Sequence, residues 1–121
     1  MLMKKQVPGE ILSGLESTGG VELSAIVSKH GLLMVSTGSD TLSNEAFAAF
    51  TATLYMSAES TTMRLSNEMP KSIIVETGTK YVIMVEAGPK ALLVVLADNA
   101  GDPVLILNDM KSASEKIARI L

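Results

Sequence analysis

The longest stretch of helical periodicity in the chain covers residues 43–67. At 100° per residue, one stripe of this stretch is aromatic and aliphatic, and we expect it to lie on a sheet: Phe47, Phe50, Leu54, Ala58, Thr61 and Leu65. A second stripe is built from small and soft side chains: Ala46, Ala49, Thr53, Met56, Ser60 and Met63. Because this second stripe is not charged, we expect it to pack against the same helix of a second subunit. The alternative is a slightly apolar surface helix in a monomer.

Shorter periodic segments surround this helix. Residues 8–17 predict a helix that begins at Pro8 and buries Ile11, Leu12 and Leu15. Residues 21–28 and 32–36 predict a β-hairpin around the turn at residues 29–31. Residues 72–77, 81–86 and 91–97 predict three strands, and their short loops favour an antiparallel meander. The last of these runs has no polar position, which indicates a central strand covered on both faces.

Cap residues set the expected ends of the helices. Ser43 suits the N-cap of the long helix, and Asn67 suits its end. Asp102 and Pro103 predict the start of a last helix, although Asn108 and Asp109 are also cap-like. The buried side of that helix is expected to carry Leu107, Met110, Ser114, Ile117 and Leu121. The order predicts one α+β domain over residues 1–121, a five-stranded antiparallel sheet with helices on both faces, preceded by a loose arm at residues 1–7.

Composition narrows the function. Hydrophobic residues make up 47% of the chain and aromatic residues only 3%, so the core must be aliphatic, with the 8 Met residues filling gaps. The net charge of −3 is scattered, which argues against a nucleic-acid surface. The absence of Cys excludes disulfides and thiolate chemistry. No signal peptide is expected after Lys4 and Lys5, and the longest apolar run, residues 91–97, is too short to span a bilayer, so we expect a cytoplasmic protein.

Candidate catalytic groups are isolated. The glycine-rich residues 14–20 have no Lys and no preceding strand, both of which a phosphate-binding loop needs. His30 is the only histidine and sits at a predicted hairpin tip, so we expect an exposed turn residue. Arg64 and Arg119 fall on predicted helices, where surface ion pairing is the ordinary role. Acidic residues at strand ends and loops lack metal-loop spacing: Glu76, Glu86, Asp98, Asp102 and Asp109. We therefore predict no catalytic residue, no metal site and no cofactor.

The apolar run at residues 72–77 is the expected edge of the meander. An open edge with this character would promote association, so we expect it to pair with the same strand of a second subunit. The same two-fold axis would bring the two long helices together. The predicted dimer interface consists of Ala46, Ala49, Thr53, Met56, Ser60, Met63, Ser72, Ile73, Ile74, Val75 and Glu76.

The order of elements and several local segments resemble the roadblock/dynein light-chain domain family. Residues 20–27 resemble its first strand, residues 30–34 its Gly-Leu turn, residues 44–58 its Ala-rich helix, and residues 99–101 its approach to the last helix. The resemblance implies a non-enzymatic homodimer or heterodimer that serves as a platform for a Ras-like small GTPase. That partner is expected on the long-helix face, at Glu45, Ala49, Ala52 and Glu59.

A second hypothesis comes from the fold order alone. A profilin-like sensor domain would hold a small molecule between the sheet and the long helix. The sequence offers no converging polar cluster for such a pocket, so the dimeric scaffold is the favoured interpretation.

Overall fold

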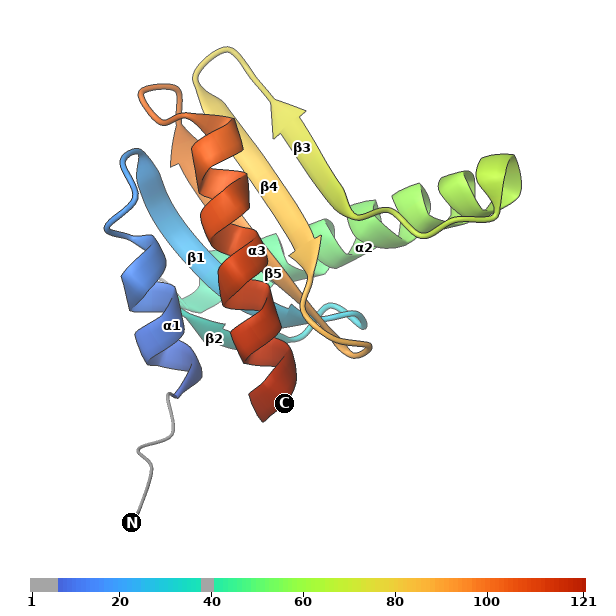
Figure 1. The fold of residues 1–121 in the computed structure, drawn as a ribbon, viewed down its shortest axis with the longest axis horizontal. Helices are drawn as coiled ribbons and strands as arrows, with labels where there is room; N and C mark the ends of the chain where they lie inside the picture. The colour runs from blue at the N-terminus through green and yellow to red at the C-terminus, as the bar shows by residue number, and fades with distance from the viewer. Residues whose placement is uncertain (1–6, 38–40) are drawn as a thin grey trace.

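The computed structural model describes residues 7–37 and 41–121, apart from the side chains of residues 41–43. Within these residues three helices and five strands follow one another in the predicted order. Their bounds are α1 (Pro8–Leu15), β1 (Val21–Ser28), β2 (Leu33–Ser36), α2 (Thr41–Ser66), β3 (Ser72–Glu76), β4 (Lys80–Glu86), β5 (Ala91–Asp98) and α3 (Pro103–Ile120). The predicted α+β class is confirmed (Figure 1). The predicted arm lies outside the described residues except for Val7.

The five strands form one antiparallel sheet in the order β2-β1-β5-β4-β3. The β1–β2 hairpin pairs Ile26 with Val35, and the meander pairs Ile74 with Ile83 and Ile83 with Val95. β5 lies at the centre and β3 at an edge, as predicted. The central position explains why β5 carries aliphatic side chains toward both faces.

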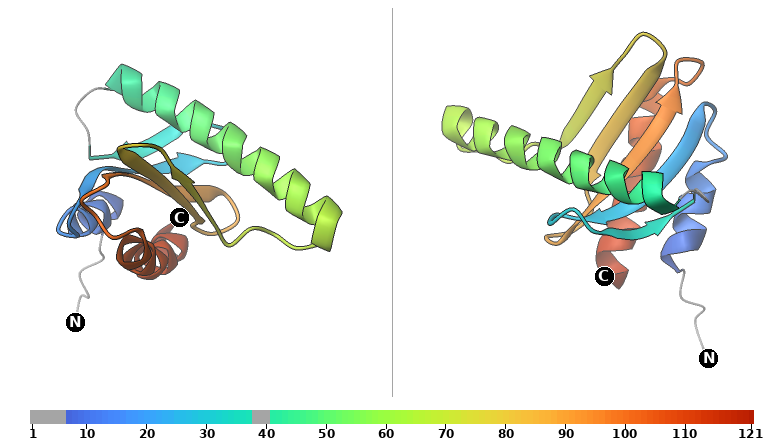
Figure 2. Two further views of the ribbon diagram at one scale, coloured as in Figure 1. Left: turned by 90° about the horizontal axis from the view of Figure 1, so that it is seen from above. Right: turned by 180° about the vertical axis from the view of Figure 1, so that it is seen from behind.

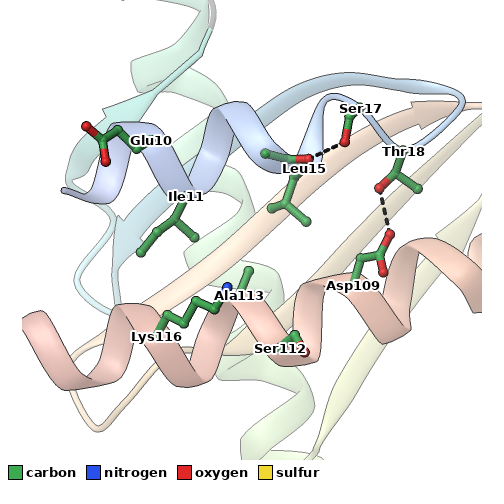
Figure 3. Close-up of a pocket in the computed structure, with 10 residues that line it drawn as sticks. Glu10, Ile11, Leu15, Ser17, Thr18, Asp109, Ser112, Ala113 and Lys116 are labelled. Atoms are coloured by element: carbon green, nitrogen blue, oxygen red, sulfur yellow. Dashed lines mark hydrogen bonds between the residues drawn. The ribbon is translucent and has the colours of Figure 1, made fainter. Parts of the chain in front are cut away.

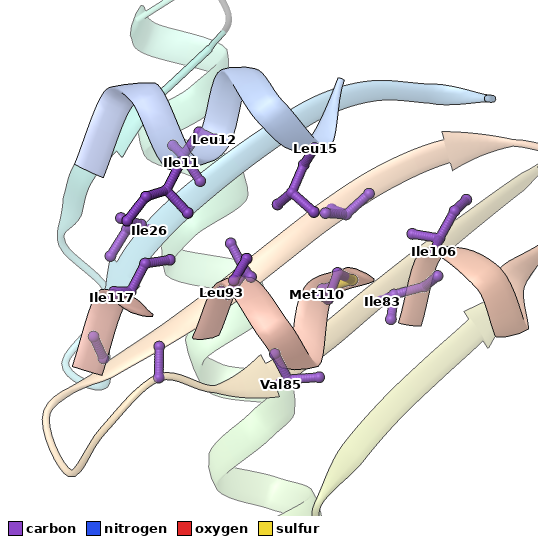
Figure 4. Packing of buried hydrophobic residues seen from close by; sticks show 14 of the residues in the cluster. Ile11, Leu12, Leu15, Ile26, Ile83, Val85, Leu93, Ile106, Met110 and Ile117 are labelled. Atoms are coloured by element: carbon purple, nitrogen blue, oxygen red, sulfur yellow. The ribbon is translucent and has the colours of Figure 1, made fainter. Parts of the chain in front are cut away.

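Helices cover both faces of the sheet. Figures 1 and 2 show α1 and α3 on one face and α2 crossing the other. On the α1–α3 face, large aliphatic side chains of the two helices and of alternate strand positions form a closed core (Figure 4). The members labelled there are Ile11, Leu12, Leu15, Ile26, Ile83, Val85, Leu93, Ile106, Met110 and Ile117. All are no more than 5% exposed, so the sheet beneath α1 and α3 is covered by the chain's own residues.

The contact between α2 and the sheet is made mainly by small side chains. Ala48, Ala52 and Tyr55 are buried on this face. They pack on residues of β1, β4 and β5: Ala25, Val27, Met84, Leu92 and Val94. The spacing of the three helix residues is i, i+4, i+7, which is one helical stripe.

The prediction of the sheet-facing stripe was therefore largely wrong. Phe50 is 73% exposed, Leu54 is 40% exposed and Leu65 is 82% exposed, and only Phe47 packs partly against the sheet. The buried stripe is rotated relative to the predicted one, because alanines allow the helix to approach the strands closely. The last turns of α2 extend beyond β3 in all three views of Figures 1 and 2.

Two helix boundaries match the predicted caps and one does not. α2 begins at Thr41, so Ser43 lies within the helix instead of capping it. Asn67 ends α2 with a φ of 58°, a left-handed conformation that Asn tolerates. The Asp102 carboxylate accepts hydrogen bonds from the backbone N–H of Val104 at 2.9 Å and of Leu105 at 3.4 Å, which confirms the cap of α3.

The buried side of α3 differs from the prediction at its ends. Met110, Ser114 and Ile117 are buried as expected, and Leu107 is partly buried. Leu121 is 51% exposed, whereas Ile106 and Ala113 are buried. The buried arc is wider than one stripe because α3 packs against α1 as well as against the sheet.

A polar cluster fixes the middle of α2 to two strand ends. The hydroxyl of the fully buried Tyr55 donates to Glu86 Oε2 at 2.9 Å. Lys29 Nζ donates to the same oxygen at 3.0 Å and lies 5.6 Å from the centre of the Tyr55 ring. Burial, followed by the hydrogen bond to Glu86 and the charges of Glu86 and Glu59, raises the pKa of Tyr55. The phenol therefore remains a hydrogen-bond donor at neutral pH.

A second fixed point joins the α1–β1 turn to the loop before α3. Gly20 has a φ of +91°, and a Cβ built on it would lie 2.6 Å from the Cα of Gly101. Backbone therefore meets backbone at this position, and a side chain can be admitted only by moving one of the two segments.

Replacing Tyr55 by Phe should lower the free energy of unfolding by about 1–2 kcal/mol at pH 7, because Glu86 loses one partner but stays partly solvated. Urea unfolding measures this change. The matched control is Tyr81→Phe, since Tyr81 is half-buried on the other face and makes no side-chain hydrogen bond among the described residues. Equal losses in the two variants would contradict a specific role for the cluster.

Gly20→Ala should lower the free energy of unfolding by about 1–3 kcal/mol, because a Cβ there meets backbone and the φ is unfavourable for Ala. The control is Gly78→Ala, whose built Cβ has nothing within 4 Å, and it should change stability by less than about 0.5 kcal/mol. Thermal or urea unfolding of the two variants measures the difference. An unchanged free energy of unfolding in Gly20→Ala would show that the two loops can move apart without cost.

Candidate functional site

The small-residue stripe of α2 lies on the surface of the molecule. Each of its six members is exposed, and the two methionines are 54% (Met56) and 40% (Met63) exposed. The stripe consists of Ala46, Ala49, Thr53, Met56, Ser60 and Met63. Uncharged and flexible side chains on an exposed helix face are typical of a surface that binds another protein.

A separate apolar groove lies between α2 and the edge of the sheet. It has a volume of about 230 Å³ and is lined by Phe47, Phe50, Thr51, Leu54, Val75 and Val82. Val75 and Val82 are paired residues of β3 and β4 that form its floor, and the helix residues form one wall. The largest wall residue, Phe50, is mostly exposed.

The stripe and the groove lie on different sides of α2. Ala49, in the stripe, lies against the β1–β2 turn. A Cβ built on Gly31 in that turn would be 3.4 Å from the Cα of Ala49. Leu54, in the groove, lies beside Val75 of β3. Ala49 and Leu54 are separated by about 140° around the helix at 100° per residue. A two-fold axis at β3 would therefore bring together Phe50 and Leu54, and not the small-residue stripe that the sequence analysis joined to β3.

β3 exposes both its backbone edge and apolar side chains. Ile73 and Val75 point toward the α2 face, where they pack near the core and line the groove. Ile74 points to the opposite face and is 44% exposed. The strand order places β4 on one side of β3 and, within the described residues, no strand on the other. The predicted edge is thus present, and the proposed contact with a second copy remains a hypothesis.

The residues predicted to bind a partner do not share one environment. Glu45 and Ala49 are exposed, and Glu59 is half-buried. Ala52 is only 2% exposed because it faces the sheet, so it cannot contact a partner in this conformation. Tyr55 was not among the predicted sheet-facing residues, although Ala48, Ala52 and Tyr55 follow the spacing of one helical face.

A polar hollow separates α1 from α3 on the other face of the molecule (Figure 3). Its volume is about 310 Å³, and it is lined by Glu10, Ile11, Gly14, Leu15, Ser17, Thr18, Asp109, Ser112, Ala113 and Lys116. The Thr18 hydroxyl donates to Asp109 Oδ2 at 2.7 Å across one end. The charged groups lie at the rim, where water solvates them, and the two serines have no imidazole or thiolate beside them. We assign no chemistry to this hollow.

The side chains that could carry catalysis are dispersed. His30 is exposed in the β1–β2 turn, as predicted. Among the described residues no group of three or more His, Cys, Asp or Glu side chains could hold a metal ion. In the same part of the chain, no helix combines the length and the hydropathy needed to cross a membrane. The surfaces with distinctive chemistry are thus the stripe, the groove and the β3 edge.

Comparison with known proteins identifies relatives over most of the chain. An uncharacterized Methanocaldococcus jannaschii protein, MJ1340, is 31% identical over 107 residues, which is 88% of this chain and 93% of that protein. The solved roadblock/LC7 domain from Streptomyces avermitilis has a TM-score of 0.88 at 22% identity and covers 93% of this chain and 95% of that one. Myxococcus xanthus MglB has a TM-score of 0.85 at 20% identity, with 93% of each chain covered.

The two solved structures show that the fold is shared. Their sequence identities of 22% and 20% are too low to support any inference beyond the fold. The family model provides the stronger link, because it matches residues 8–97, from the start of α1 almost to the end of β5. The chain therefore belongs to the Roadblock/LC7 domain family.

Proposed function

We propose that this chain is a dimeric regulatory scaffold that binds a Ras-like small GTPase on the outer face of α2, in the cytoplasm. The observation that carries the proposal is the small-residue stripe of α2, whose six members are all exposed within the part of the chain that the structure describes. Roadblock/LC7 domains are regulatory and not catalytic, and the sequence resemblance implies that they act as platforms for small GTPases. A flat face of Ala, Ser, Thr and Met can lie close to a partner without burying charge.

The proposed dimer uses the opposite flank of α2 together with the sheet edge. β3 would pair with β3 of a second copy, and Phe50 and Leu54 would meet the second α2 above the joined sheet. Exposed Phe50, Leu54 and Ile74 all lie at or beside this edge. Their burial would contribute to association at roughly 25 cal/mol per Å² of apolar area before the costs of binding. A heterodimer with a second roadblock protein could use the same groups.

The proposed GTPase surface keeps most of the residues that the sequence suggested. Glu45, Ala49 and Glu59 remain, Ala52 is removed because it is buried, and the remaining members of the small-residue stripe are added. The two arginines of the sequence, Arg64 and Arg119, lie in the last turns of α2 and α3 and not in loops. A stimulating effect on GTP hydrolysis would therefore come from repositioning groups of the GTPase and not from an inserted arginine of a loop.

The rival hypothesis, a small-molecule sensor, has less support. It requires space between α2 and the sheet, but Ala48, Ala52 and Tyr55 fill that layer and are no more than 2% exposed. The nearby groove opens beside the helix and has apolar walls, so it offers few polar groups to orient a ligand.

Ile74→Lys should convert a dimer into a monomer, because two ammonium groups would meet at the joined edge. We expect the Kd of the dimer to rise at least about 30-fold, which corresponds to losing an interface residue worth about 2 kcal/mol of binding free energy. Light scattering on a sizing column gives the molar mass. The matched control is Met34→Lys on the other edge strand, where Met34 is 46% exposed and Ile74 is 44% exposed. A wild-type monomer, or a Met34→Lys monomer, would contradict the proposed edge.

Thr53→Arg should weaken GTPase binding by about tenfold or more without changing the molar mass, because it puts a long cation on the small-residue stripe. The probes are the Ras-like GTPases of the organism that encodes this chain, each loaded with GDP or a non-hydrolysable GTP analogue. Ser112→Arg on the exposed side of α3 is the control. Absence of nucleotide-dependent binding to the wild-type protein would refute the partner assignment.

A further inference from the structure

We propose that Met56 and Met63, on the outer face of α2, form a reversible oxidation site that switches partner binding off when a hydroperoxide such as hydrogen peroxide is present. This inference rests on the proposed function and deepens it, because it assigns a means of regulation to the GTPase surface. It follows from which methionines are exposed, from where they lie on α2 and from what an added oxygen does to that face.

The methionines of the described residues divide into a buried and an exposed group. Met84 and Met110 are 0% exposed and belong to the core layers on the two faces of the sheet. The members of the other group are between 40% and 54% exposed: Met34, Met56, Met63 and Met69. Because a thioether must meet the oxidant in order to react, the exposed group should oxidise in the folded protein while the buried group stays reduced.

Two of the exposed methionines share the outer face of α2, which Figure 2 shows turned away from the sheet. Met56 and Met63 are seven residues apart, so they lie two helical turns apart on one stripe, about 10 Å along the helix axis. The other members of the stripe are Ala, Ser and Thr residues. The large apolar contacts of this face are therefore made by two side chains that a hydroperoxide can oxidise.

Oxidation converts each thioether to a sulfoxide in one balanced step. The sulfur lone pair attacks one oxygen of hydrogen peroxide, and an S–O bond forms as the O–O bond breaks. The released hydroxide takes the proton of the transferred oxygen and leaves as water, so the sulfur loses two electrons and the peroxide gains them. Methionine sulfoxide reductases reverse the step with the electrons of a dithiol, one class of enzyme for each sulfoxide epimer. The sequence has no Cys, so no thiol of the chain competes for the oxidant.

The added oxygen changes the binding face and leaves the fold intact. A sulfoxide oxygen is a hydrogen-bond acceptor that water solvates, and a partner docked on the stripe would bury it. Glu59 lies one turn from each of the two methionines, and its carboxylate supplies a further acceptor and no donor. Because Met84 and Met110 stay reduced, the two core layers keep their packing. The oxidised protein should therefore remain folded and bind its partner less tightly.

Treatment with hydrogen peroxide, at a concentration that leaves the circular dichroism unchanged, tests the site. Peptide mass spectrometry should find one added oxygen on Met56 and one on Met63, and none on Met84 or Met110. The Kd for the nucleotide-loaded Ras-like GTPase that the reduced protein binds should rise at least about tenfold. Incubation with both classes of methionine sulfoxide reductase should return the Kd to its value before oxidation.

Matched variants separate this site from oxidation elsewhere on the surface. Met56→Leu/Met63→Leu keeps two apolar side chains of similar volume, so its Kd, whatever the starting value, should no longer change on peroxide treatment. Met34→Leu/Met69→Leu removes the other exposed methionines and should respond as fully as the wild type. Met56→Gln/Met63→Gln puts an amide at both positions and should bind weakly before any oxidant is added.

The outcomes separate the oxidation site from the broader function. Unmodified Met56 and Met63 in a protein whose Met34 is fully oxidised would overturn the site. An unchanged Kd after oxidation of both residues would overturn the control of binding, and so would a response that disappears in Met34→Leu/Met69→Leu. A reduced wild-type protein that binds no GTPase would refute the partner assignment and, with it, the control of binding. Failure of the switch alone is seen in a protein that binds GTPase equally before and after oxidation.

Discussion

The close approach of α2 to the sheet through alanine side chains is the constraint that decides which face of α2 is exposed. Ala48 and Ala52 fill little space, so the helix axis lies near the strands, and Tyr55 is the one large side chain of α2 that is fully buried there among the described residues. With its narrow face toward the sheet, α2 turns its bulky side chains to the flank beside β3 and its small residues outward. The hydrogen bond from Tyr55 to Glu86 anchors α2 at its last buried residue, and the later turns of the helix are mostly exposed.

The two faces of the sheet serve different purposes. The α1–α3 face contains the large aliphatic side chains and is closed, with backbone packed on backbone where Gly20 meets Gly101. That layer supplies most of the apolar burial that stabilises the domain. The α2 face has a thinner layer and leaves Phe50, Leu54 and Met56 exposed. Contiguous exposed apolar patches commonly mark protein–protein interaction sites, and this agrees with the proposal that partners bind the α2 face.

The two sheet edges also differ in a way that bears on association. β2 is four residues long, and its pairing with β1 shifts register between Ile26 and Val27. Short and irregular strands make poor templates for a further strand. β3 pairs in unbroken register with β4 over all five of its residues and has apolar side chains on both faces. An association through the sheet would therefore use β3, and the proximity of β3 to Phe50 and Leu54 links the sheet edge to the helix flank.

Local patterns in the sequence determined the order of elements, the hairpin, the meander and the capping of α3 by Asp102, because these depend on residues close together in the chain. They also identified β3 as an apolar edge and the small-residue stripe of α2 as unusual. The rotation of α2 about its axis could not be predicted, since both stripes are apolar enough to be buried and only the shape of the sheet selects Ala48, Ala52 and Tyr55. The separation of the stripe from the β3 edge follows from that rotation. Tertiary structure alone decided which face of α2 lies beside β3, because helix packing on the sheet sets that position and sequence spacing does not.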